Sequence, residues 1–283
     1  MKNKINIGII QMEIRSDSSD QNLKIENFEK SLKIIEETDG IELFVFPDDF
    51  YGGYGYGMLN SPDFAVMGYI DELKEIAIKK QVYIAGSSLF LVPNNTDFKS
   101  YSKGFLISKD GELIAEQDRN YLLNREKIWI LPGNEIKVFD TELGKIAFVL
   151  GFDTLFSNVW QSLLNNQVEI VINPLLYIPI HEGVKENDLP IDFINLKEVY
   201  KSSQIYHAYF NSCYILSASG IGNYAHAKQY RCAGGSRVVF PTGKYVELSN
   251  DNEDILKLTI SNEDLENKKE LINFYEKLNM QMG

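Results

Sequence analysis

The sequence predicts an α/β protein in which two mixed β-sheets face each other and helices cover the outer face of each sheet, an α-β-β-α sandwich. The first observation behind this prediction is that short apolar runs typical of buried strands alternate with longer segments that carry apolar residues at helical spacing. The second is that no Pro/Gly/Ser-rich linker divides the 283 residues. Residues 1–283 are therefore expected to form a single domain.

The first half of the chain contains the clearest signals. Residues 22–37 place Ile25, Phe28, Leu32 and Ile35 at helical spacing among lysines and glutamates, which predicts an amphipathic helix with these four residues inward. A proline at position 47 ends an apolar run, as expected for a buried strand. Asp110-Gly111 predicts a hairpin turn. The other predicted elements are strands at 5–12, 41–47 and 82–90 and a helix at 62–80.

The second half repeats this alternation of strands and helices. A hairpin is predicted around Thr242-Gly243, and a charged helix is expected at the C-terminal end of the sequence. The remaining predictions are strands at 145–150, 169–173, 213–218 and 254–260 and helices at 155–165, 192–210 and 262–278.

Composition excludes several classes of function. The net charge is −12, and the chain has no run of Lys or Arg that would neutralise nucleic-acid phosphates or an anionic membrane. Two cysteines, Cys213 and Cys232, are too few for a disulfide framework and lack metal-ligand spacing. The N-terminal stretch does not resemble a signal peptide, and no apolar run reaches the length of a membrane span. We therefore expect a cytoplasmic protein in a reducing compartment, with no nucleic-acid or membrane partner.

Several segments occur in an order that resembles the nitrilase, or carbon–nitrogen hydrolase, superfamily. FVFPDDFYGGYGYG begins at Phe44, GKIAFVLGFDTLF covers 144–156, INPLL covers 172–176 and GGSRVVFPTG covers 234–243, while Pro132-Gly133 matches a further landmark. These landmarks span more than two hundred residues, and the resemblance implies the α-β-β-α sandwich of that superfamily.

The resemblance also implies which positions would carry the chemistry. The family's glutamate, lysine and cysteine correspond here to Asp48, Asn120 and Gly151, and its second, supporting glutamate corresponds to Glu126. Glycine has no side chain and cannot act as a nucleophile. Aspartate is one methylene shorter than glutamate, and asparagine lacks the charge of an ammonium. The usual hydrolase activity of the family is therefore not expected.

A substitute nucleophile is not evident from the sequence. Cys232 precedes the Gly-x-Ser segment and is a better candidate than Cys213, which lies in a predicted buried strand, but packing is the expected role of both. The histidines at positions 181, 207 and 226 do not cluster, so that no serine–histidine pair is indicated.

The predicted fold would bring several carboxyl groups together without the family's lysine. Asp153 and Asp49 are expected near Asp48, where they would pair with an arginine, shift their pKa values or bind a cationic ligand or Mg²⁺. Tyr54 lies in a glycine-rich loop with three other aromatic residues, and together with Asp153 and Cys232 it is a candidate ligand-binding residue. The simpler interpretation is that Asp153 caps a helix and Asp49 faces solvent. No metal ligand set and no cofactor is predicted.

Three hypotheses about function remain open. The first is a catalytically inactive homologue that binds a small molecule or serves as a partner subunit, forming a homodimer or a heteromer with a related enzyme, as the resemblance implies. The second is a carbon–nitrogen hydrolase that uses Cys232 or a water activated by Asp48. The third is a purely structural assembly protein.

Overall fold

A computed structural model of the chain contains two six-stranded sheets and one three-stranded sheet. The structure describes residues 1–15, 22–51, 66–91, 99–123, 126–176, 180–181, 196–223, 230–248 and 252–270.

The first sheet combines strands from the first half of the chain with one strand from its far end. Its order is β15-β1-β2-β3-β4-β5. The central strands β1, β2 and β3 run parallel to one another, and the outer pairs are antiparallel. The bounds are β1 (Lys4–Gln11), β2 (Leu43–Asp48), β3 (Tyr83–Leu91), β4 (Ser100–Ile107), β5 (Leu113–Asp118) and β15 (Asp254–Ser261).

The second sheet repeats this arrangement with the order β14-β13-β10-β8-β7-β6. Here β7, β8 and β10 are parallel, and the outer pairs are antiparallel. The bounds are β6 (Val138–Thr141), β7 (Gly144–Phe148), β8 (Ile170–Ile172), β10 (Tyr214–Ser217), β13 (Arg237–Val239) and β14 (Tyr245–Glu247). The small sheet consists of β9 (Ile180–His181), β11 (Ile221–Asn223) and β12 (Tyr230–Ala233).

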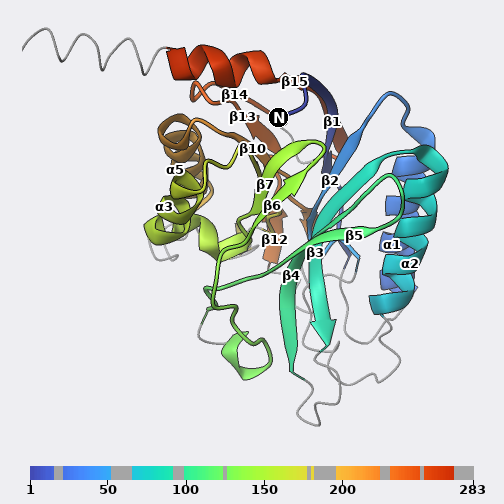
Figure 1. The fold of residues 1–283 in the computed structure, drawn as a ribbon. Coiled ribbons are helices and arrows are strands. Elements are labelled where there is room, and N and C mark those ends of the chain that lie inside the picture. Colours follow the sequence, from blue (N-terminus) through green and yellow to red (C-terminus); the bar gives the residue numbers. More distant parts are fainter. Residues whose placement is uncertain are drawn as a thin grey trace, which may run out of the picture.

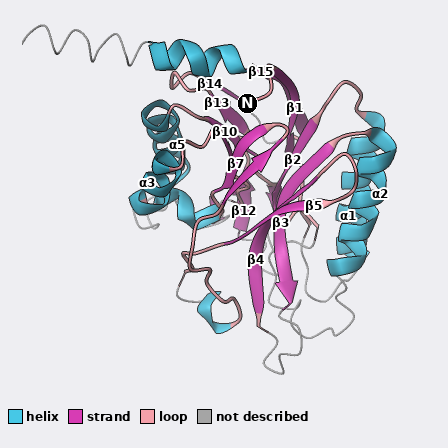
Figure 2. Ribbon diagram, viewed as in Figure 1, coloured by secondary structure: helices cyan, strands magenta, loops and turns pink. Residues whose placement is uncertain are grey.

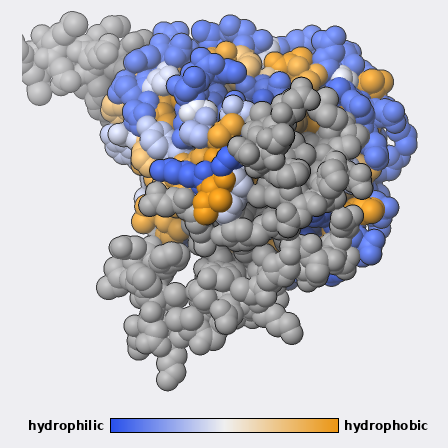
Figure 3. All heavy atoms as spheres, turned by 90° about the horizontal axis from the view of Figure 1, so that it is seen from below, coloured by the Kyte–Doolittle hydropathy of each residue, from blue (hydrophilic) through white to orange (hydrophobic). Residues whose placement is uncertain are grey.

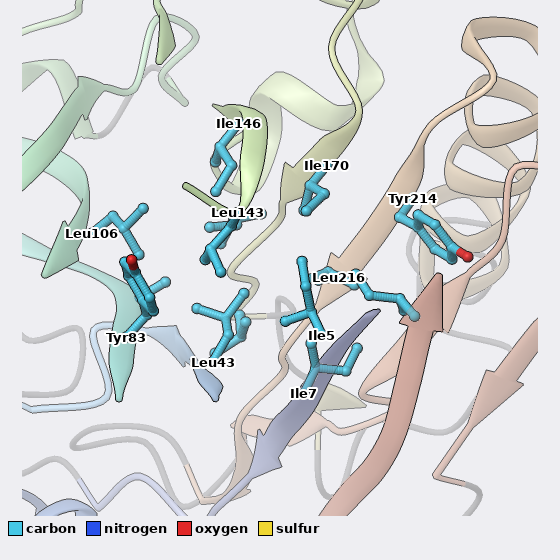
Figure 4. Close-up of a cluster of buried hydrophobic side chains, with 14 of the residues drawn as sticks. Ile5, Ile7, Leu43, Tyr83, Leu106, Leu143, Ile146, Ile170, Tyr214 and Leu216 are labelled. Carbon is cyan, nitrogen blue, oxygen red and sulfur yellow. The ribbon is translucent and has the colours of Figure 1, made fainter. Parts of the chain in front are cut away.

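Helices cover the outer faces of the two large sheets (Figures 1 and 2). The helices α1 (Asn22–Glu37) and α2 (Val66–Lys80) pack on the first sheet, and α3 (Ser157–Asn165) and α5 (Leu196–Asn211) pack on the second. Between the sheets lies a core of aliphatic side chains from both, including Ile7, Leu43, Ile146 and Leu216 (Figure 4). The predicted α-β-β-α sandwich is confirmed.

The helix predicted at 22–37 has the expected bounds, but its buried stripe is narrower than expected. Phe28 and Ile35 are buried, whereas Ile25 is 46% exposed. The reason is that the buried positions run through Lys24, Phe28, Ser31 and Ile35, and Ile25 follows that stripe by one residue, a rotation of about 100°. The prediction that Ile25 faces the core is therefore wrong.

The sequence did not predict β6 or the three-stranded sheet. The side chains of β6 are mostly half-exposed, so that the strand lacks the apolar run that marked the others. Three predicted stretches, 62–65, 192–195 and 271–278, lie outside the described residues.

On the described surface seen in Figure 3, hydrophobic residues form several separate patches. Hydrophilic residues surround these patches, as the acidic composition leads one to expect. No described helix combines the length and the apolar composition that a membrane span requires.

Candidate active site

Asp48 ends β2 and is enclosed by the first sheet. Its side chain is 3% exposed. In the neighbouring parallel strand β3, Ser87 lies opposite Asp48, and its hydroxyl donates a hydrogen bond of 2.5 Å to Asp48 Oδ1. Ser87 was not singled out from the sequence, although the ends of adjacent parallel strands are where site residues gather. Ser87 therefore orients the carboxyl group at the position of the family's glutamate.

Gly151 begins the 3-10 helix η3 (Gly151–Leu155), shortly after β7. Its φ of +47° belongs to the left-handed region, which favours glycine. A Cβ atom built on Gly151 would lie 3.2 Å from Arg119 Nη1 and 3.8 Å from Asp48 Oδ2. The fold thus brings Asp48 and Gly151 together, and a guanidinium lies next to the point where a nucleophilic side chain would start.

Arg119 supplies the cation of this site. Its backbone is fixed on both sides, because its N–H donates to Ser102 O at 2.8 Å and its carbonyl accepts from Gly133 N at 2.8 Å. The guanidinium is buried, and Nη2 donates to Glu126 Oε1 at 3.0 Å. The second oxygen of Glu126 accepts the N–H of Leu123 at 2.7 Å. Glu126, on η2 (Glu126–Ile128), therefore holds Arg119 in place by a charge-assisted bond.

Asn120, which the resemblance placed at the lysine position, has a different environment from Arg119. Its side-chain amide donates to Glu135 O at 3.1 Å. A Cβ on Gly133 would lie 2.3 Å from Asn120 Oδ1, so the Pro-Gly landmark leaves room for this side chain. Asn120 therefore contacts the segment after the turn, while the residue before it carries the positive charge.

Asp153 links η3 to the segment after β5. Its carboxylate is fully buried and accepts the N–H of Asn120 at 3.0 Å and the N–H of Tyr121 at 2.6 Å. Burial raises the pKa of Asp153 to about 6, and these two hydrogen bonds oppose the rise. The interpretation of Asp153 as a helix cap is wrong, because its carboxylate bonds across the sequence to the segment that carries Arg119.

Asp49 does not face solvent as expected, because its side chain is only 2% exposed. Burial raises the pKa of Asp49 well above its usual range, and the charge of Asp48 raises it further. Burial also raises the pKa of Asp48, partly offset by Arg119 and by the hydrogen bond from Ser87. Asp48, Asp49 and Glu126 therefore share one buried region with a single described guanidinium, that of Arg119.

The two cysteines are buried. Cys213 packs in the core beneath α3 and α5, and Cys232 lies on β12 opposite Gly222. Burial raises the pKa of each thiol to about 12, which disfavours the thiolate that attacks carbonyl groups. Burial also lowers the pKa of His207, to about 4, and its ring stacks on Trp160 in the helical layer. Tyr54 lies outside the described residues.

Buried ionisable groups with shifted pKa values are typical of functional sites. Burying charge is unfavourable unless it is paired, so a cluster of carboxyl groups around one guanidinium is hard to explain by stability alone. Among the described residues, no group of His, Cys, Asp and Glu side chains has the arrangement of a metal site. The cluster is therefore a candidate site for acid–base chemistry or for binding a polar molecule.

A family model described as carbon-nitrogen hydrolase matches residues 6–270. The chain belongs to this family. Saccharomyces cerevisiae Nit3, described as a member of branch 10 of the nitrilase superfamily, shares the fold with a TM-score of 0.78 at 20% identity, covering 95% of this chain and 94% of Nit3. A carbon–nitrogen hydrolase of Helicobacter pylori matches with a TM-score of 0.77 at 20% identity, covering 98% and 94%.

Relatives by sequence are hydrolases and amidases. Omega-amidase NIT2-B of Xenopus laevis is 22% identical over 256 residues, which cover 84% of each protein. A hydrolase of Schizosaccharomyces pombe is 26% identical over 181 residues, 59% of this chain. This match spans only 54% of the Schizosaccharomyces pombe protein. A separate match, to a probable hydrolase of Bacillus subtilis, spans 20% of that protein.

Proposed function

We propose that the chain is a carbon–nitrogen hydrolase that cleaves a small carboxamide with water as the nucleophile, activated by Asp48. The observation that carries this proposal is the placement of Asp48 Oδ2 and Arg119 Nη1 within 3.8 and 3.2 Å of the point where a side chain on residue 151 would begin. A base and a cation are thus directed at the place where family members would form a bond to the substrate.

Water is the proposed nucleophile because the chain offers no suitable thiol. Residue 151 is glycine, and both cysteines are buried with pKa values raised to about 12. In the proposed reaction Asp48 accepts a proton from water, and the water oxygen bonds to the carbonyl carbon. Arg119 faces the oxyanion that forms. When this oxyanion returns to a carbonyl, the C–N bond breaks and the nitrogen takes up a proton to leave as ammonia or an amine.

The environment of Asp48 supports its role as a base. Its pKa is raised by burial, so that its ionised form is a stronger proton acceptor than an exposed aspartate. The sign of the pH dependence follows: kcat/KM is expected to fall as the pH decreases through the raised pKa of Asp48, because protonation removes the base.

A second candidate function is binding without turnover. Arg119 Nη1 lies only 3.2 Å from the start of the missing side chain, where a guanidinium suits a carboxylate or carboxamide oxygen of a bound molecule. On this alternative the chain retains the family's site as a receptor for a small acid or amide.

Ammonia release from a panel of primary carboxamides distinguishes the two functions. Asp48→Asn is expected to lower the rate of ammonia release by about 10²- to 10⁴-fold, because it removes the general base. Asp39→Asn is a matched control, because the Asp39 side chain is 93% exposed, and it should leave turnover unchanged. Saturable binding of an amide without ammonia release would instead support the receptor function.

A Gly151→Cys variant tests the nature of the nucleophile. The Cβ atom that carries the new thiol would lie 3.8 Å from Asp48 Oδ2, and mass spectrometry should then detect an acyl adduct that the wild-type chain does not form. An acyl adduct on the wild-type chain would contradict hydrolysis by water.

A further inference from the structure

Asp49 is held in an unusual conformation directly after the proposed base. Its φ is +48°, a left-handed value that is uncommon for residues other than glycine, although aspartate and asparagine adopt it more readily than most. The constraint is visible, since Asp49 N donates to Ser87 O at 3.0 Å. The same residue of β3 therefore fixes the backbone of Asp49 and the carboxyl group of Asp48.

The carboxyl group of Asp49 is buried and incompletely satisfied. One of its oxygens, Oδ1, has no hydrogen-bond partner, although the side chain is only 2% exposed. A backbone hydrogen bond from Leu89 accounts for one interaction of the carboxyl group. A buried carboxyl oxygen without a partner is unfavourable in a folded protein, more so when it is ionised, which is why such oxygens point to a proton or a ligand.

The charged groups around Asp49 bear on whether its carboxyl group holds a proton or a ligand. Asp48 on β2 and Glu126 on η2 raise its pKa, while Arg119 after β5 lowers it, and burial raises it more than any of these. Arg119 is already bonded to Glu126. A buried carboxyl oxygen without a hydrogen-bond partner is less unfavourable on a neutral carboxylic acid than on a carboxylate, so Asp49 is the member of the Asp48–Asp49 pair that we expect to hold a proton.

Building on the proposed function, we propose that Asp49 is the general acid of the reaction, so that its protonated carboxyl group supplies the proton that the leaving nitrogen needs. Asp48 takes one proton from water as the new C–O bond forms, and Asp49 donates one to nitrogen as the C–N bond breaks. The products are a carboxylic acid and ammonia or an amine. Transfer of the proton from Asp48 to Asp49, directly or through solvent, restores the starting state.

This division of roles points to a class of substrate. An amide nitrogen is a poor leaving group unless it is protonated, whereas the phenolate of an activated ester leaves without a proton. Asp49 is therefore expected to matter for carboxamides and anilides and to be dispensable for nitrophenyl esters of the same acid.

The test compares Asp49→Asn with the wild-type chain and with Asp48→Asn on an amide and a nitrophenyl ester of one acid. We expect Asp49→Asn to lower kcat/KM for the amide by about 10²-fold or more while the ester changes by only a few fold. Asp48→Asn should impair both substrates. Asparagine tolerates a positive φ, and the ratio of the two substrates does not depend on how much of the variant is folded.

An equal loss on amide and ester in Asp49→Asn would overturn the general acid while leaving the proposed hydrolase intact. Absence of turnover on both substrates in the wild-type chain would overturn the proposed function itself and the acid role with it. Infrared difference spectra supply a readout besides activity. Wild type minus Asp49→Asn should show the carbonyl stretch of a protonated carboxylic acid at neutral pH, and the absence of that band would overturn the assignment whatever the turnover.

Discussion

At residue 151 the absence of a side chain and the position of the Arg119 guanidinium depend on each other. The positive φ of +47° places Gly151 where its missing Cβ would lie 3.2 Å from Arg119 Nη1. A contact of this length is tighter than most Cβ contacts, so a side chain here requires Arg119 to move. The site is therefore adapted to glycine in its backbone and in its neighbours.

Gly151→Ala is expected to destabilise the fold by more than about 1 kcal/mol, because alanine is unfavourable at positive φ and meets Arg119. Gly40→Ala is the matched control, since Gly40 has φ +76° with nothing within 4 Å of its Cβ position. Urea denaturation of both variants separates the backbone effect, shared by the two, from the contact. An equal loss of unfolding free energy in both variants would mean that Arg119 moves aside at no measurable cost in stability.

Asp153→Asn should lower the free energy of unfolding by about 1–3 kcal/mol, since an amide nitrogen cannot accept one of the two buried N–H groups. The folded pKa of about 6 is higher than that of an unfolded aspartate. The stability that Asp153 contributes is thus full at acidic pH, below the unfolded pKa, and is lost as the pH rises through the folded one.

Denaturation curves of wild type and Asp153→Asn between about pH 4 and pH 7 check this sign. The wild type should lose stability relative to the variant as the pH rises. If the wild type instead gained unfolding free energy relative to Asp153→Asn toward neutral pH, the result would contradict a raised pKa for Asp153.

At the scale of elements, a buried polar network connects η3 with α5 and the second sheet. Asn173 Nδ2 donates to Thr154 Oγ1 at 3.0 Å, Gln204 Nε2 donates to Asn173 Oδ1 at 2.5 Å, and Arg237 Nη1 donates to Gln204 Oε1 at 2.6 Å. Arg237 also pairs with Glu247 at 3.3 Å. These side chains set the position of the turn that carries Gly151 relative to the helix behind it.

Gln204→Ala is expected to lower the free energy of unfolding by about 3 kcal/mol, because the change removes a buried partner from an amide and from a guanidinium. Gln161→Ala on α3 is the control. The Gln161 side chain is exposed, and among the described residues it bonds only to Asn165, four residues later, so the loss should stay within about 0.5 kcal/mol. A similar change in both variants would show that the network carries little stability.

The sequence predicted the elements well where an apolar pattern was strong. The bounds of α1 were reproduced, and the strands at the centres of both large sheets were each found as buried runs. It failed at β6, whose mostly half-exposed residues carry no such pattern. Alignment to the family motif places Asn120 at the lysine position, and only the fold shows that the cation next to Gly151 is the neighbouring Arg119.

At the scale of the whole molecule, the fold buries both thiols. Cys213 and Cys232 are at most 1% exposed and belong to different parts of the fold. We expect neither to react with Ellman's reagent in the folded chain and both to react in denaturant, at rates that follow unfolding. Rapid modification of one thiol under native conditions would indicate local opening, at β12 if it is Cys232.

The pairing of β15 with β1 has a consequence for folding during translation. Eight residues from Lys4 to Gln11 pair with eight from Ser261 back to Asp254. About 250 residues of translation separate the two strands, on the order of ten to fifty seconds at typical speeds. During that interval the nascent sheet keeps an open, isoleucine-rich margin, which is a template for aggregation. Chaperones that shield this margin until β15 emerges are expected to raise the yield of folded protein.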